Sequence, residues 1–132
     1  MARRFEWPVR VYWEDTDAGG IVYHATYLAF LERARSEWLR AVGIDQLRLR
    51  AEERLQFAVV EMSIAWRRAA RVDDLLTVTA ELAGQRGASI KFAQAVLRGA
   101  EHLLAATVRV AALDADTLKP RRLPQGFNRK FG

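Results

Sequence analysis

The sequence predicts an α+β domain in which one long helix packs against an antiparallel sheet. Three observations carry this prediction. Residues 25–42 repeat their apolar side chains with the period of a helix, while the runs before and after them have the character of strands. The connections between the later runs are short and rich in Gly, Asp and Gln, as in hairpins. With 132 residues, no internal repeat and no linker, the chain is expected to form a single domain over residues 1–132.

The first strand is expected over Trp7–Glu14. Its apolar positions Val9, Val11 and Trp13 alternate with polar ones, which is the period of a half-buried strand. Pro8 cannot donate a ladder hydrogen bond, so this strand is expected at an edge of the sheet.

The long helix is expected from about Ala25 to Val42. One stripe of its surface is apolar, and Gly43 is suited to end it in a left-handed conformation. The stripe contains Tyr27, Leu31, Ala34, Trp38 and Ala41. A second, weaker helix is expected over Asp45–Arg54, with Asp45 as its N-cap.

Four strands are expected after the helices, and their short connections predict that successive strands are antiparallel neighbours. The ranges are Phe57–Arg68, Leu75–Ala83, Ala88–Arg98 and Leu103–Leu113. Their alternation is blurred, which indicates a sheet covered on both faces, by the helix and by a partner subunit.

Composition excludes several classes of protein. Hydrophobic residues make up 51% and charged residues 28% of the chain, which is typical of a globular domain. There is no cysteine, so disulfides, thiol catalysis and cysteine-ligated zinc are excluded. No apolar run reaches the roughly 20 residues that span a bilayer, and no signal-peptide pattern follows Met1. The net charge of +5 favours anionic partners. The sequence contains no motif that reads nucleic acid, and no nucleic-acid partner is expected.

The stretch Glu14–His24 is the main candidate for chemistry. It places Asp17 beside two glycines, just before the long helix, whose N-terminal N–H groups attract negative charge. The same residue types also suit an ordinary turn, in which Asp17 would be a capping acid. Asp15 is the rival acid, and we expect it to accept a local hydrogen bond.

The residues of this stretch also carry a family resemblance. The segment YWEDTDAGGIVYHATY (residues 12–27), followed by FLERAR (30–35), resembles the 4-hydroxybenzoyl-CoA thioesterase class of hotdog-fold proteins, and within it the YbgC-type, Tol–Pal-associated acyl-CoA thioesterases. Shorter matches continue through RVDDL (71–75), QRGAS (85–89) and LKPRRLP (118–124), so that the resemblance covers nearly the whole chain.

The resemblance implies a hotdog fold that dimerises by joining its sheets edge to edge, with homodimers that often pair into homotetramers. It implies hydrolysis of acyl-CoA thioesters at sites shared between two subunits. Asp17 matches the family's catalytic aspartate, acting as nucleophile or as general base, and His24 matches a histidine close to it. The backbone N–H of His24 matches the group that polarises the thioester carbonyl. Neither a cofactor nor a metal is expected.

Further residues are candidates for binding the substrate. Tyr23 is expected to line the acyl pocket, and two basic clusters are candidates for the phosphates of coenzyme A. The first cluster is Arg86 with Gly87 and Ser89, and the second is Lys119 with Arg121 and Arg122. Either cluster has the alternative interpretation of a solvated surface.

The resemblance also implies partners and a location. Acyl carrier protein is a possible second acyl donor, and phospholipid-synthesis enzymes are possible partners of a cytoplasmic protein that sits peripherally at the inner membrane face. Two other functions remain open from the sequence: a non-catalytic module that binds acyl-CoA or acyl carrier protein on the same fold, and a basic nucleic-acid-binding domain.

Overall fold

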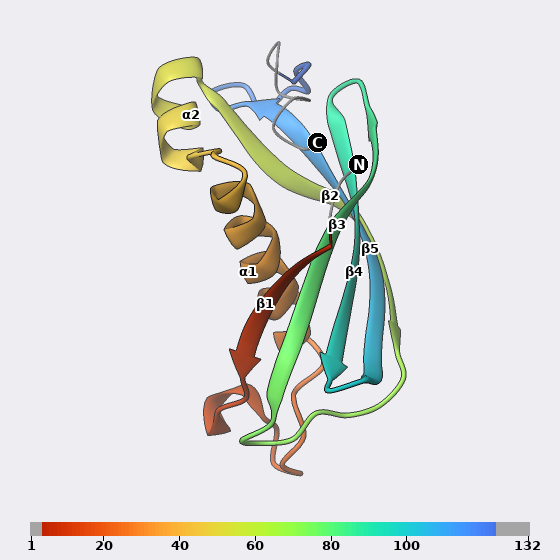
Figure 1. Ribbon diagram of the computed structural model, residues 1–132. Coiled ribbons are helices and arrows are strands. Elements are labelled where there is room, and N and C mark those ends of the chain that lie inside the picture. Colours follow the sequence, from red (N-terminus) through yellow and green to blue (C-terminus); the bar gives the residue numbers. More distant parts are fainter. Residues whose placement is uncertain (1–3, 124–132) are drawn as a thin grey trace.

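The structure, a computed structural model, describes residues 4–123. Five strands form one open antiparallel sheet in the order β1-β3-β4-β5-β2, and helix α1 lies along one face of it (Figure 1). The elements are β1 (Phe5–Arg10), the 3-10 helix η1 (Trp13–Asp15), α1 (Thr26–Ala41), α2 (Gln46–Glu53), β2 (Leu55–Trp66), β3 (Leu75–Arg86), β4 (Ser89–Arg98) and β5 (Glu101–Asp114). The predicted α+β class is confirmed. No helix in this part of the chain has the length and apolar character needed to cross a membrane.

Strand β1 is an edge strand, as Pro8 indicated, but it ends at Arg10 instead of Glu14. The alternation of side chains continues beyond Arg10, yet the Asp15 carboxylate accepts a hydrogen bond from the Tyr12 N–H at 2.8 Å. This local bond draws Trp13–Asp15 into a 3-10 turn. The sequence prediction was therefore wrong at this end, because a side-chain acceptor competes with the sheet for the backbone.

Helix α1 supplies one side of the hydrophobic core. Phe30, Leu31 and Ala34 are fully buried, and Trp38 packs edge-on against Phe92 of β4 with ring centroids 5.2 Å apart. Burying such side chains removes a large apolar area from water and holds the helix to the sheet. The predicted stripe is confirmed except at its last position, since Ala41 is exposed in the final turn.

Two residues, Gly43 and Asp45, set the boundary between α1 and α2. Gly43 has φ +88°, which lets the chain leave α1 in the predicted left-handed conformation. The Asp45 side chain accepts a hydrogen bond from the Arg48 N–H at 3.1 Å and caps α2, also as predicted. Leu47 on this short helix is 80% exposed.

Strand β2 lies at the other edge of the sheet and pairs with β5. The expectation that β2 and β3 are neighbours was wrong: the chain from Arg67 to Asp74 crosses the end of the sheet instead of turning back as a hairpin (Figure 1). The register of β2 shifts between Val59 and Glu61, which is a bulge of the kind found at sheet edges.

The remaining strands are joined by two-residue turns, Gly87–Ala88 between β3 and β4 and Gly99–Ala100 between β4 and β5. The sheet therefore has two distinct ends (Figure 1). We call the end that carries residues 11–25, residues 67–74 and the Gly99–Ala100 turn the loop end. The opposite end, with α2, the Gly87–Ala88 turn and residues 115–123, is the hairpin end.

Candidate active site

Asp17 lies in a tight turn at the loop end. Its Oδ1 accepts a hydrogen bond from the Gly19 N–H at 2.8 Å, and its own N–H donates to the Ile21 carbonyl at 2.9 Å. Gly20 has φ +80°, and a Cβ on Gly19 would come within 3.2 Å of the Asp17 carboxylate. The positive φ favours glycine at position 20, and a side chain at position 19 would press on the Asp17 carboxylate.

His24 lies two residues before the first turn of α1. Helix α1 has no capping side chain: Ala25 occupies the N-cap, and no acid is present in the first turn. Within residues 4–123, the N–H of His24 has no hydrogen-bond acceptor. An uncommitted N–H at the positive end of a helix dipole is suited to stabilise an oxyanion.

Asp17 and His24 line the same pocket, which has a volume of about 350 Å³. Ile21, Val22 and Tyr27 also line this pocket, together with four successive residues, Trp66, Arg67, Arg68 and Ala69, which we call the pocket wall. The His24 ring lies 6.2 Å from the Trp66 ring, edge to face. The two residues that the sequence put forward for catalysis are thus brought together next to a wall that the sequence analysis did not propose.

Asp15 and Tyr23 lie outside this pocket. The Asp15 carboxylate accepts its bond from Tyr12, which is the local role expected of it, and lines a separate hollow between β1 and α1. Tyr23 is half-exposed and packs on the His24 ring at 4.5 Å between centroids. Tyr23 contacts a residue of the pocket without lining the pocket in this chain.

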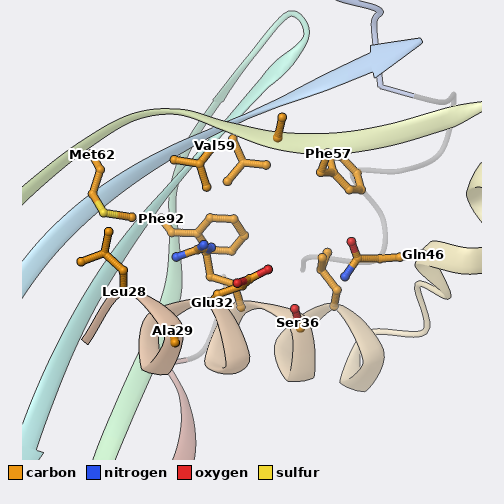
Figure 2. A pocket seen from close by; sticks show the side chains of 13 residues that line it. Leu28, Ala29, Glu32, Ser36, Gln46, Phe57, Val59, Met62 and Phe92 are labelled. Atoms are coloured by element: carbon orange, nitrogen blue, oxygen red, sulfur yellow. The ribbon is translucent and has the colours of Figure 1, made fainter. Parts of the chain in front are cut away.

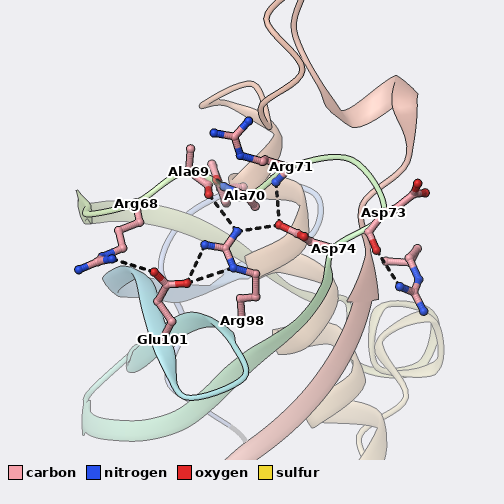
Figure 3. Close-up of polar contacts among 10 residues, drawn as sticks. Arg68, Ala69, Ala70, Arg71, Asp73, Asp74, Arg98 and Glu101 are labelled. Carbon is pink, nitrogen blue, oxygen red and sulfur yellow. Dashed lines mark hydrogen bonds and ion pairs between the residues drawn. The ribbon is translucent and has the colours of Figure 1, made fainter.

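A charged network joins Arg68 and Ala69 of the pocket wall to Asp74, Arg98 and Glu101 (Figure 3). Arg98, the last residue of β4, donates to the Asp74 carboxylate at 2.8 Å and to the Ala69 carbonyl at 3.2 Å. Its other nitrogens donate to one oxygen of Glu101, and the second Glu101 oxygen accepts from Arg68 at 3.0 Å. One guanidinium therefore binds the connection 67–74 at two points and the first residue of β5 at once.

Asp74 gives this network a pH dependence. Partial burial opposes ionisation of Asp74, but hydrogen bonds from the Arg71 N–H and the Arg98 side chain outweigh it, so the pKa of Asp74 is lowered. The stability that this carboxylate contributes is therefore present above its ordinary pKa of about 3.9 and is lost as pH falls through the lower, folded value.

We expect Asp74→Asn to destabilise the protein by about 1–2 kcal/mol at pH 7, because Asn keeps the shape and loses the charge that Arg98 binds. Urea unfolding of the two proteins from pH 7 down to about pH 3 measures this difference, which should shrink over the last unit. A difference that stays constant over this range would contradict the assigned role of Asp74.

A larger groove runs between α1 and β2 (Figure 2). Its volume is about 520 Å³, and its first residue on the helix is Leu28, one turn after His24. The apolar walls come from Leu28, Leu39, Phe57, Val59, Met62, Phe92 and Val110. Arg35 also lines it: this side chain is 7% exposed, its pKa is lowered by burial, and it donates to the Gln94 side chain at 2.9 Å.

The predicted phosphate-binding residues lie at the hairpin end, away from Asp17 (Figure 1). Gly87 forms the β3–β4 turn with φ +56°, and the Ser89 hydroxyl donates to the Arg86 carbonyl at 3.1 Å. The Arg121 guanidinium donates to the carbonyls of Glu53 and Arg54 at 2.8 and 3.1 Å.

The two basic clusters are neighbours in the fold. Ala112 of β5 links them, because its N–H donates to the Ala88 carbonyl and its carbonyl accepts from the Arg121 N–H. Lys119 precedes Arg121 on the same segment, where its carbonyl accepts from the Asp114 N–H. The two clusters thus lie on either side of Ala112 at the hairpin end, where Arg121 also lies 4.0 Å from the Asp114 carboxylate, and we call them together the cationic surface.

Sequence reasoning missed the wall residues Trp66, Arg67 and Arg68 and the network residue Arg98. An aromatic residue followed by two arginines at the end of a strand is a usable signal for a binding site, whereas the position of Arg98 gives none. Among residues 4–123, no group of three or more His, Asp or Glu side chains is placed to hold a metal ion.

Comparison with known proteins places this site in a family. A family model described as the thioesterase-like superfamily matches residues 11–131. Acyl-CoA thioesterase YbgC of Haemophilus influenzae is 46% identical over 127 residues, which cover 96% of this chain and 93% of that protein. Acyl-CoA thioester hydrolase YbgC of Escherichia coli O6:H1 is also 46% identical, over 128 residues that cover 96% and 95%.

Solved structures agree with these sequence matches. A probable thioesterase from Bartonella henselae has 40% identity and a TM-score of 0.83, covering 94% of this chain and 100% of its own. A 4-hydroxybenzoyl-CoA thioesterase mutant complexed with 4-hydroxybenzoyl-CoA has a TM-score of 0.91 at 18% identity, covering 99% and 100%; at that identity the likeness shows the fold.

The fold and the matches define a hotdog-fold thioesterase. The chain belongs to the thioesterase-like superfamily, and its relatives at 46% identity are acyl-CoA thioesterases of the YbgC type. The family and fold expected from the Asp17 motif are thereby confirmed.

Proposed function

We propose that this protein hydrolyses acyl-CoA thioesters to a free acid and coenzyme A, with Asp17 as the reacting carboxylate. The observation that carries the proposal is that Asp17 and His24 line one pocket at the uncapped start of α1. A carboxylate and an uncommitted N–H on two residues of one pocket supply the two groups that thioester hydrolysis needs. The acyl-CoA thioesterase names of the YbgC relatives support the same reaction.

Two routes use Asp17. In the first, its carboxylate oxygen attacks the thioester carbon, the C–S bond breaks, coenzyme A leaves as a thiolate that takes up a proton, and water then opens the mixed anhydride. In the second, Asp17 takes a proton from water, the water oxygen attacks the same carbon, and the proton passes to the departing sulfur. In both routes the negative oxygen of the intermediate accepts a hydrogen bond from the His24 N–H.

We assign the His24 side chain a supporting role in binding substrate or orienting water. Its ring is fixed between those of Tyr23 and Trp66. The groove between α1 and β2 is the proposed site of the acyl group, because it starts one turn after His24 and its walls are mainly apolar. From Leu28 to Leu39 it follows the helix for about 16 Å at 1.5 Å per residue.

The cationic surface at the hairpin end is the proposed site of the coenzyme A phosphates, through Arg86, Gly87, Ser89, Lys119 and Arg121. It cannot serve the Asp17 of the same chain, since β3 alone spans 12 residues, about 40 Å, between the two ends. We therefore propose that the phosphates of one substrate bind to a second copy of the chain. The free edge of β2, with Val59 and Val60 exposed, supports a homodimer joined there, and pairs of dimers would give a homotetramer.

The same cationic surface suits acyl carrier protein as a second acyl donor. The net charge of +5 favours an anionic partner, whether a carrier protein or a membrane-bound phospholipid-synthesis enzyme. We accordingly propose a cytoplasmic protein that acts close to the inner membrane face.

A thiol-release assay tests the proposal. Acyl-CoAs from short aliphatic through aromatic to long-chain, and the matching acyl carrier proteins, are mixed with the protein and the free thiol is measured. We expect release above background for at least one class, at rates in the usual enzymatic range of about 1 to 10³ per second. If the protein binds acyl-CoA and releases no thiol from any member of the panel, it is a binding module and the enzymatic proposal is wrong.

A further inference from the structure

After Trp66, the last residue of β2, the pocket wall continues into a segment without helix or strand, residues 67–74. The N–H groups of Arg67 and Arg68 donate to the Leu103 carbonyl of β5 at 2.8 and 3.1 Å, and because the segment connects strands that are not neighbours, no ladder continues along it. Instead, individual bonds fix it at separate points. Ala70 donates its backbone N–H to the Tyr27 hydroxyl at 3.0 Å, and the Ala70 carbonyl accepts a hydrogen bond from the Val22 N–H at 2.9 Å.

This attachment couples the wall to the catalytic turn. Val22 follows Ile21, whose carbonyl accepts the Asp17 N–H, and Ile21 itself bridges to Arg71 of the wall segment. A displacement of the wall at Ala70 therefore displaces the turn that carries Asp17. The wall is thus part of what sets the position of Asp17 relative to His24.

Arg98 binds the same segment next to these attachment points. Its guanidinium binds the Ala69 carbonyl, one peptide away from the bonds to Tyr27 and Val22, and the Asp74 carboxylate at the end of the segment. Through Glu101 it also orients Arg68 at the rim of the pocket. The side chains of Arg98, Asp74 and Glu101 are 32%, 23% and 33% exposed, so the network is partly shielded from solvent.

From this geometry we propose that Arg98 is a positioning residue for thioester hydrolysis. It touches neither Asp17 nor the pocket, and it acts by fixing the wall to which the Asp17 turn is hydrogen-bonded. Two of its three acceptors, the Ala69 carbonyl and the Asp74 carboxylate, lie at separate points of the segment 67–74, and the third, Glu101, begins β5. A planar fork of donors reaches all three; the single ammonium of Lys does not. The inference rests on the proposed activity of the Asp17 pocket.

Substitution of Arg98 with chemical rescue tests this role. Arg98→Ala should lower kcat by at least about tenfold with KM within about threefold of wild type, because small errors in placing a catalytic group slow the chemical step without weakening substrate binding. Guanidinium ion at millimolar concentrations, far below those that denature proteins, should restore part of the lost kcat. Arg98→Lys, which keeps the charge and the stem, should show the same loss.

Arg48→Ala is the matched control. The Arg48 guanidinium binds a single carboxylate, that of Glu52, on the exposed surface of α2. Its removal should leave kcat unchanged, and guanidinium should not increase the activity of this variant. A folded Arg98→Ala with kcat within about twofold of wild type, or with its loss confined to KM, would overturn the inference.

Hydrogen exchange separates this inference from the proposed function. The Ala70 amide should exchange faster in Arg98→Ala and in Arg98→Lys than in wild type, and at the wild-type rate in Arg48→Ala. If wild-type protein releases no thiol, the proposed function fails while exchange still reports whether Arg98 holds the wall. If thiol release is normal and neither kcat nor exchange changes in the Arg98 variants, the inference alone fails.

Discussion

Asp17→Asn should reduce kcat for acyl-CoA hydrolysis by roughly 10²- to 10⁴-fold, the range that an acid–base group contributes to an enzymatic step. The amide keeps the shape of the carboxylate and an oxygen that accepts the Gly19 N–H, so the turn should survive. It lacks the negative charge needed either to attack the thioester or to take a proton from water. Release of thiol under saturating substrate measures the loss.

Two Asp→Asn variants are controls for this experiment. Asp45→Asn makes the same chemical change at the N-cap of α2, where the two residues cap about equally well, and should be fully active. Asp15→Asn distinguishes the rival acid, since Asp15 lies outside the pocket. Near-wild-type turnover by Asp17→Asn, or a greater loss in Asp15→Asn, would remove Asp17 from its assigned role.

Gln94→Leu should lower the free energy of unfolding by about 3 kcal/mol, because it leaves buried polar groups without partners. The Gln94 side chain is 4% exposed and joins α1 to the sheet: its oxygen accepts from Arg35, and its nitrogen donates to the carbonyls of Leu31 and Thr79. Leucine has a similar volume, so the cost comes from lost hydrogen bonds and not from a cavity. Urea unfolding at pH 7 measures it.

A double mutant tests whether the loss of stability comes from the Arg35 guanidinium that Gln94→Leu leaves unpaired. In Arg35→Met with Gln94→Leu, the charged group left unpaired by the single substitution is itself replaced by an apolar side chain. The double mutant should therefore be more stable than Gln94→Leu alone. Equal or lower stability of the double mutant would mean that the Arg35–Gln94 bond is not what the single substitution disrupts.

The parts of the fold that local sequence decides were predictable. Each of these features depends on residues within one or two helical turns: the apolar period of α1, the left-handed conformation of Gly43 and the Asp45 cap. The Asp17 motif is equally local, because its turn is closed by Gly19, two residues away. Family resemblance then supplied the hotdog topology, which residue patterns alone did not.

The parts that depend on contacts distant in sequence were not predictable. The connection from Arg67 to Asp74 has the length and composition of a hairpin loop, yet β2 pairs with β5. Arg98 has the residue type of any surface position, and its role arises only because β4 ends beside this connection. Even β1 was misjudged locally, since the alternation of its side chains does not show that Asp15 captures the Tyr12 N–H.

The bare N-terminus of α1 has a consequence for the stability of this protein. A capping side chain is worth about 1 kcal/mol, and one is present on the short α2, at Asp45, but not on the long helix α1. On the proposed mechanism, an aspartate at this helix end would set a second negative charge beside the oxyanion. The bare helix end would then trade stability for activity, and thermostabilising designs should leave it as it is.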